Sequence, residues 1–230
     1  MPTLNLQGLS ILGYSRVKPS GTATPAINPA TGATLAPGYF WTTQADVDRA
    51  ASLAAQAFAV YQRWPAKRRA AFLRRIADLF EANSATIIER ANLETALPPG
   101  RLQGETARTC GQLRLFASLI EDGWWVDARL DHGDPNRKPL PGPDVRSMLM
   151  PLGPVAVFSS SNFPFAFSVA GGDTASALAG LSAAPTDVAL VDLALGDDNG
   201  LDLISKDNAK FFYTDKWLAR RGSKAFEPWK

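Results

Sequence analysis

The sequence predicts an α/β fold in which a β-hairpin and four helices precede the start of a parallel sheet. Three observations support this prediction: a turn signal near the amino terminus, apolar residues at helical spacing between about 43 and 121, and a strand-turn-helix pattern over 153–180. The last pattern is how a parallel α/β nucleotide-binding unit begins. With 230 residues, of which 46% are hydrophobic and 20% charged, the chain can bury a sizeable core.

Residues 1–41 are expected to form short strands and turns. Leu4 to Leu12 is mildly apolar, and the run from Asn28 to Gly32, Asn-Pro-Ala-Thr-Gly, is typical of a turn between two hairpin strands. The apolar period then changes from two to between three and four residues. This change predicts that helices follow the hairpin.

Four helices are predicted from their start and stop signals. The first begins at Thr43, where Asp46 completes a capping box, and the second has Pro65 as its first residue. The third spans about 84–96 and stops before Pro98-Pro99-Gly100, and the fourth spans about 101–121. The apolar positions that carry these predictions are Val47, Ala50, Ala54, Phe58, Tyr61, Phe72, Ile76, Leu79, Phe80, Cys110, Leu113, Phe116, Leu119 and Ile120.

The segment after the helices is expected to open a sheet. Residues 131–143 are rich in proline and are predicted to be an extended connector without regular structure. Residues 145–150 alternate like a strand, and 153–158 form a short apolar run typical of a strand buried on both faces. A polar turn over 159–164 and a helix of small residues over 165–180 follow, with Gly171 and Gly172 allowing close packing.

Composition excludes several function classes. The net charge of +2 does not suggest a nucleic-acid partner, and the arginine-rich stretch over 63–75 reads as a solvated helix face. With one cysteine, Cys110, and one histidine, His132, the chain cannot form an internal disulfide or a His/Cys metal cluster. No apolar run is long enough for a membrane span and no signal peptide is evident, so a cytoplasmic location is expected.

The polar turn over 159–164 is the candidate functional site. In open parallel sheets, ligands bind where strands end and helices begin, and this turn offers hydroxyls, backbone amides and the carboxamide of Asn162. It lacks the Gly-x-Gly-x-x-Gly spacing, so any pyrophosphate would be bound in a different way. From the residues alone, a capped turn without function explains the same pattern.

Several motifs resemble the aldehyde dehydrogenase family, in the family's order and spacing. They are the Asn28–Gly32 turn, the helix start at Asp46–Ala50, and the strand and turn from Leu152 through Asn162-Phe163-Pro164. Two further runs, 101–116 and 167–179, are similar to the branch that oxidises α-ketoglutaric semialdehyde (2,5-dioxopentanoate). The resemblance covers about residues 25–180.

This resemblance implies an incomplete aldehyde dehydrogenase-like nucleotide-binding domain. It implies oxidation of an aldehyde to the acid with NADP or NAD, in which a cysteine thiolate attacks the carbonyl and a glutamate activates water. Asn162 matches the asparagine that helps to hold the oxyanion, and Phe158, Ser159, Ser160 and Ser161 match the turn that lines the nicotinamide and its ribose. The implied partner is a small-molecule aldehyde, and family members form homo-oligomers.

The resemblance ends near Gly180. The expected division is a hairpin and helical part over 1–143, the start of a Rossmann-like sheet over 144–180, and a divergent tail over 181–230. The acidic residue Asp187 stands about where the family has a cofactor-binding lysine, and no counterpart of the catalytic domain follows. Cys110 is expected to be a buried structural thiol and His132 has no assigned role. The chain alone is therefore expected to be a truncated and inactive dehydrogenase.

Two alternatives remain open at this point. The chain could be a non-catalytic fragment that binds nucleotide or pairs with another subunit. A short strand-and-turn pattern over 187–200 also resembles the phospho-accepting strand of receiver domains, with Asp192 in the acceptor place. That interpretation is weaker, because the acidic pair that a receiver needs for magnesium is not found upstream.

Overall fold

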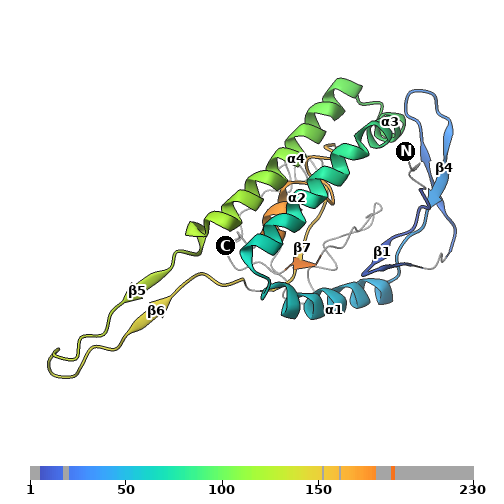
Figure 1. Ribbon diagram of the computed structural model, residues 1–230. Helices are drawn as coiled ribbons and strands as arrows, with labels where there is room; N and C mark the ends of the chain where they lie inside the picture. The colour runs from blue at the N-terminus through green and yellow to red at the C-terminus, as the bar shows by residue number, and fades with distance from the viewer. Residues whose placement is uncertain (1–5, 18–20, 152, 161, 180–187, 190–230) are drawn as a thin grey trace, which may run out of the picture.

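Four helices occupy the middle of the chain, as the apolar spacing predicts (Figure 1). The computed structural model describes residues 6–17, 21–151, 153–160, 162–179 and 188–189. The four helices are α1 (Gln44–Tyr61), α2 (Ala66–Ala82), α3 (Ser84–Thr95) and α4 (Pro99–Asp122). A 3₁₀ turn, η1 (Trp124–Val126), follows α4.

The helix boundaries follow the signals in the sequence. Thr43 caps α1: its hydroxyl accepts the amide of Asp46 at 3.2 Å, and its own amide donates to the Asp46 carboxylate at 2.9 Å. This reciprocal pair confirms the predicted capping box. Pro65 is the N-cap of α2 and precedes its first residue, one position from the prediction. Gly123 ends α4 with φ of 75°, a left-handed conformation that glycine adopts at no steric cost.

Two small hairpins precede the helices. Strand β1 (Ile11–Leu12) pairs with β2 (Ser15–Arg16), and β3 (Thr24–Ile27) pairs with β4 (Thr34–Tyr39), both antiparallel. The predicted Asn28–Gly32 turn joins β3 to β4. In it, the Asn28 carboxamide oxygen accepts the amide of Ala30 at 2.9 Å and the Asn28 carbonyl accepts that of Gly32 at 2.8 Å.

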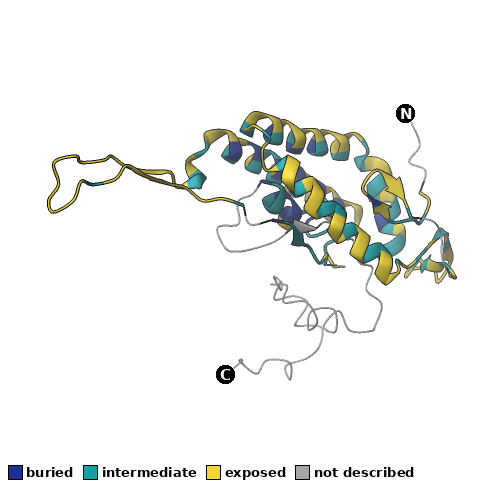
Figure 2. Ribbon diagram, turned by 90° about the horizontal axis from the view of Figure 1, so that it is seen from below, coloured by how far each residue is buried: buried dark blue, intermediate teal, exposed yellow. Residues whose placement is uncertain are grey.

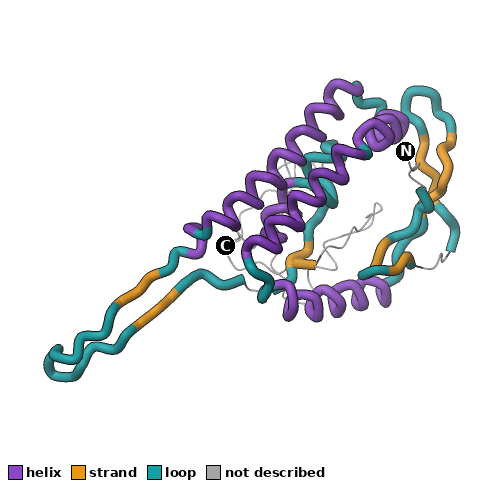
Figure 3. The backbone as a smooth tube through the Cα atoms, viewed as in Figure 1, coloured by secondary structure: helices purple, strands orange, loops and turns teal. Residues whose placement is uncertain are grey.

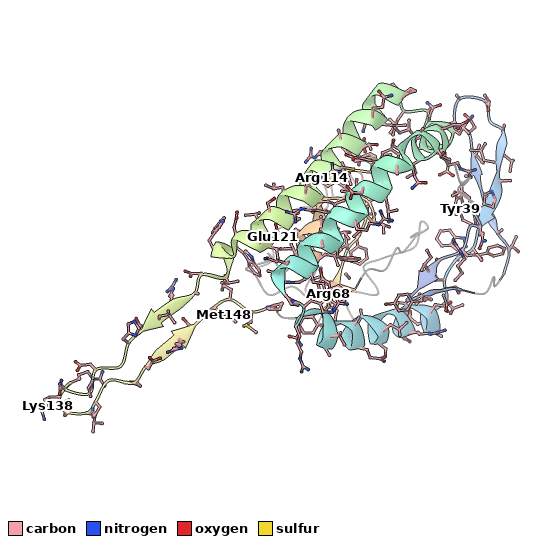
Figure 4. The ribbon with its side chains drawn as sticks, viewed as in Figure 1. Tyr39, Arg68, Arg114, Glu121, Lys138 and Met148 are labelled. Carbon is pink, nitrogen blue, oxygen red and sulfur yellow. The ribbon has the colours of Figure 1, made fainter. Side chains whose placement is uncertain are left out.

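The core lies where α2, α4 and α5 (Gly172–Ala179) meet. Small residues allow the three helices to approach closely, and leucine and isoleucine fill the space between them. Outside this core, Arg114 of α4 reaches Glu81 and Asp78 of α2 at 2.6 and 3.0 Å (Figure 4). The buried members of the core are Ala70, Leu73, Ala77, Cys110, Leu113, Ala117, Ile120, Ala175 and Ala179.

The prediction of a connector without regular structure over 131–143 was right for most of the segment, which forms turns and loop, but it missed a strand that ends at Asp131 and an isolated bridge. Strand β5 (Arg129–Asp131) pairs antiparallel with β6 (Val145–Ser147), and a bridge joins Asp134 to Gly142 farther out. The segment is therefore the outer half of a two-stranded arm that extends from the end of α4, with Lys138 near its tip and Met148 near its base (Figures 3 and 4). The arm is almost wholly exposed (Figure 2). Prolines cannot donate to a hydrogen-bond ladder, so a proline-rich segment does not read as a strand in the sequence.

The predicted sheet begins after the arm. Strand β7 (Val155–Ala156) pairs in parallel with β8 (Val188–Ala189), which confirms the parallel opening, although β7 is shorter than the predicted strand over 153–158. The helix predicted over 165–180 is also shorter, because residues 162–171 form turns and α5 begins only at Gly172. The side chains of Tyr61 and Arg69 donate to carbonyls at the end of α5, those of Leu178 and Ala179.

Candidate functional site

The turn after β7 is held in shape by its own backbone. The Ser160 amide donates to the carbonyl of Phe167 at 2.8 Å, and the Ser160 carbonyl accepts the amide of Phe163 at 3.3 Å. The ring of Phe163 lies edge-on to that of Phe167, with centroids 5.4 Å apart. The chain therefore folds back on itself within eight residues, and Asn162 lies in this fold.

Asn162 is exposed, and one end of its carboxamide is already engaged. The Ser160 hydroxyl donates a short hydrogen bond to the Asn162 side-chain oxygen. Because that oxygen is the acceptor end, the contact orients the amide nitrogen away from Ser160 as a donor. A fixed N–H donor in an accessible turn can stabilise a developing negative charge.

Residues that follow Asn162 anchor the turn in the interior. Phe165 is 6% exposed and Ala166 is fully buried. The Phe165 ring lies edge-on to Phe80 of α2, with centroids 5.6 Å apart, and packs in a second core cluster with Ala91 and Leu102. The site is therefore an exposed polar turn attached to a buried aromatic anchor.

The structure brings most of the predicted site residues together. Phe158 and Ser160 are half-buried and Ser159 is exposed, all in the same turn as Asn162 at the carboxyl end of β7. Ser161 lies outside the described residues. Serine hydroxyls at this end of a parallel strand fit the hydroxyls of a ribose, because each can donate and accept. The assignment of these residues to a nicotinamide cofactor remains a prediction.

Cys110 is a buried thiol, as the sequence predicts. It is 1% exposed on the core side of α4, and its Sγ lies 3.6 Å from the carbonyl oxygen of Ala77. Burial, with a smaller contribution from the carboxylate of Glu81, raises the pKa of the Cys110 thiol above its ordinary value. A nucleophilic cysteine needs the opposite environment, one that stabilises the thiolate and exposes it.

We expect Cys110 to react with a thiol reagent at pH 8 more than about a hundredfold more slowly in the folded chain than in urea, because reaction requires opening of the core. Raising the pH should speed the reaction because the thiol ionises when the core opens, and the rise should continue above the usual range for cysteine because burial raises the pKa of the folded thiol. The measurement is the absorbance of the thiolate that the reagent releases when it reacts with the cysteine. The matched control is Cys110→Ser combined with Ser118→Cys, an exposed site on the same helix. Equal rates for the two chains would contradict this interpretation.

The structure gives no support to the other candidates from the sequence that it describes. His132 lies exposed in the arm, and Asp187 and Asp192 lie outside the described residues. Within the described part of the chain, no three His, Cys, Asp or Glu side chains gather as a metal site. None of the helices described is both long and apolar enough to cross a membrane.

Three residues near the turn were missed as site residues. Arg101, Glu105 and Thr109 of α4 each contact residues between 162 and 166. Their spacing of four places them on one helix face, and a glutamate on a face with buried neighbours is the signal that could have found them. Only the fold shows what they contact.

Comparison with known proteins gives a consistent result. Residues 17–180 match the model of the aldehyde dehydrogenase family. The chain is 50% identical over 177 residues to α-ketoglutaric semialdehyde dehydrogenase 2 of Azospirillum brasilense, covering 76% of this chain and 34% of that protein. It is 51% identical over 144 residues to α-ketoglutaric semialdehyde dehydrogenase of Acinetobacter baylyi, covering 62% and 27%. The chain thus spans about a third or less of the length of these relatives.

Solved structures show the same fold over a similar part of the chain. An NAD-dependent benzaldehyde dehydrogenase from Corynebacterium glutamicum is 26% identical with a TM-score of 0.63, covering 77% of this chain and 37% of that one. An aldehyde dehydrogenase from Brucella melitensis, at 24% identity, shares the fold with a TM-score of 0.65, covering 76% and 34%.

Proposed function

The chain belongs to the aldehyde dehydrogenase family, and we propose that it serves the oxidation of α-ketoglutaric semialdehyde to the acid with NAD(P)+. The proposed substrate rests on the two relatives at about 50% identity, which carry that aldehyde in their names. The proposed reaction rests on one observation in this chain: the Ser160 hydroxyl holds the oxygen end of the Asn162 carboxamide and leaves its amide free to donate.

In this proposal Asn162 donates its side-chain N–H to the substrate oxygen when that oxygen becomes negative. A preorganised donor stabilises the transition state without reorienting during the reaction, which is typically worth a factor of about 10²–10³ in rate. Phe158, Ser159, Ser160 and Ser161 would hold the nicotinamide and its ribose, and that cofactor, when bound, accepts the hydride. The cytoplasm and a homo-oligomeric state belong to the same proposal.

The 230 residues alone are proposed not to turn over aldehyde. The single cysteine of the chain is Cys110, and it lies in the core of α2, α4 and α5. Its burial favours the alternative that the chain by itself acts as a nucleotide-binding or subunit-pairing module. Titration with NADP+ in a calorimeter, without any turnover, distinguishes the two: saturable binding that Ser160→Ala weakens supports the module.

The dehydrogenase role can be tested in a chimera that carries residues 17–180 in place of the matching segment of the A. brasilense relative. We expect semialdehyde-dependent NAD(P)H formation, and we expect Asn162→Ala to lower kcat about 10²–10³-fold because the oxyanion loses its donor. Asn162→Asp is the matched control, since it keeps the shape but replaces the N–H donor by an oxygen and should lose at least as much. An Asn162→Ala chimera with unchanged kcat would contradict the proposed role.

A further inference from the structure

A stripe of polar side chains on α4 connects the helix to the Asn162 turn. Arg101, Glu105 and Thr109 follow one another at intervals of four residues and so lie on one face of the helix. This face points to the segment that follows β7, more than fifty residues later in the sequence. The proposed chemistry assigns no role to any of the three.

Glu105 is the centre of the stripe. It is only 6% exposed, and one carboxylate oxygen accepts two backbone amides, those of Phe165 at 3.1 Å and Ala166 at 3.3 Å. The other oxygen accepts Nε of Arg101 at 3.3 Å. A buried carboxylate is costly unless donors surround it, and these three donors satisfy that requirement. Glu105 thereby fixes the backbone of the turn three and four residues after Asn162.

Arg101 extends this contact to Asn162 itself. Its guanidinium donates to the Asn162 carbonyl oxygen at 2.5 Å and lies over the Phe163 ring, 4.8 Å from the ring centroid. Because the same guanidinium also binds Glu105, the Glu105 carboxylate fixes the orientation of the Arg101 side chain toward Asn162. Thr109 adds a third attachment, donating its hydroxyl to the Phe165 carbonyl at 3.0 Å.

We propose that Glu105, acting through Arg101, is the positioning residue that holds the Asn162 carboxamide where the oxyanion forms. The proposal rests on the proposed role of Asn162 as the donor. An exposed turn residue otherwise samples several backbone conformations, and a displacement of about 1 Å of a catalytic group can cost about a hundredfold in rate. The stripe on α4 restricts this freedom at both the carbonyl of Asn162 and the amides that follow it.

The first test uses the full 230-residue chain and NMR. In Glu105→Ala, we expect the amides of Phe165 and Ala166 to exchange with solvent at least about tenfold faster, because each loses a hydrogen bond to a charged acceptor. Glu105→Gln, which keeps one oxygen acceptor, should restore most of the protection. The matched control is Glu89→Gln, an exposed carboxylate on α3. Unchanged exchange of both amides in Glu105→Ala would overturn the proposal.

The second test separates positioning from a purely structural role. Arg101 is partly exposed, so Arg101→Gln should leave exchange in the α2–α4 core unchanged while the Asn162 side-chain amide resonances move toward their values in an unfolded peptide. The signal that disappears in Asn162→Asp identifies these resonances. Arg75→Gln is the control, since Arg75 is an exposed arginine on α2. If Arg101→Gln leaves the Asn162 signals in place, the proposal is wrong.

The same substitution in the chimera gives the functional readout. We expect Arg101→Gln to lower kcat about tenfold with little change in KM, and Arg101→Lys to recover part of the loss. A change in KM with kcat unchanged would contradict the positioning role. The NMR tests require no dehydrogenase activity, so a failure of the proposed function, seen as full activity of Asn162→Ala, is distinguishable from a failure of the positioning role.

Discussion

Gly171→Ala should lower the free energy of unfolding by about 1–3 kcal/mol and disturb the Asn162 turn. A Cβ at position 171 would stand 2.6 Å from the carbonyl oxygen of Ala166 and 2.7 Å from the amide nitrogen of Ser168. Both neighbours are backbone atoms, so neither can rotate away. The Ala166 carbonyl also accepts the amide of Gly172 at 3.0 Å, the contact from which α5 starts. Relieving the clash therefore requires the turn or the helix start to shift.

The measurement is urea unfolding followed by circular dichroism, with the Asn162 side-chain resonances as a local readout. Gly111→Ala is the matched control, because a Cβ at position 111 on α4 meets no atom within 4 Å. Alanine there should stabilise the chain by about 0.5–1 kcal/mol, the usual gain over glycine inside a helix. Equal effects of the two substitutions would show that the close approach at Gly171 does not constrain the turn.

Leu113→Ala should destabilise the chain by about 2–5 kcal/mol, the largest effect that we expect from a core substitution. Leu113 is 1% exposed on α4 and belongs to the cluster formed by α2, α4 and α5. Removing its side chain leaves a cavity that the small residues around it, such as Ala77 and Ala117, cannot fill. Because α5 packs in the same cluster and follows the Asn162 turn, the loss should also loosen the turn.

Leu115→Ala provides the comparison for this prediction. Leu115 lies two residues farther along α4 but is 57% exposed, so alanine there should change the unfolding free energy by no more than about 0.5 kcal/mol. Thermal and urea unfolding of both variants measure the difference. A cost below about 1 kcal/mol for Leu113→Ala would mean that α2, α4 and α5 do not form the main core of the chain.

The helices were predictable because their signals are local. The Thr43 capping box, the proline before α2 and the glycine after α4 each act within a few residues of the boundary that they set. The strands and the helix around the site were less predictable. Residues 165–171 have the composition of a helix but form turns, because Phe165 and Ala166 are held by Glu105 and the core.

By itself, the sequence determined the helical part, the hairpin turn, the α/β class, the burial of Cys110 and the turn that carries Asn162. All of these depend on short-range patterns or on motifs in a fixed order. Only the tertiary structure decided that residues 131–143 belong to a two-stranded arm and that α4 supports the Asn162 turn. These features depend on pairing between distant segments, and no local pattern encodes which buried carboxylate will meet which backbone amides.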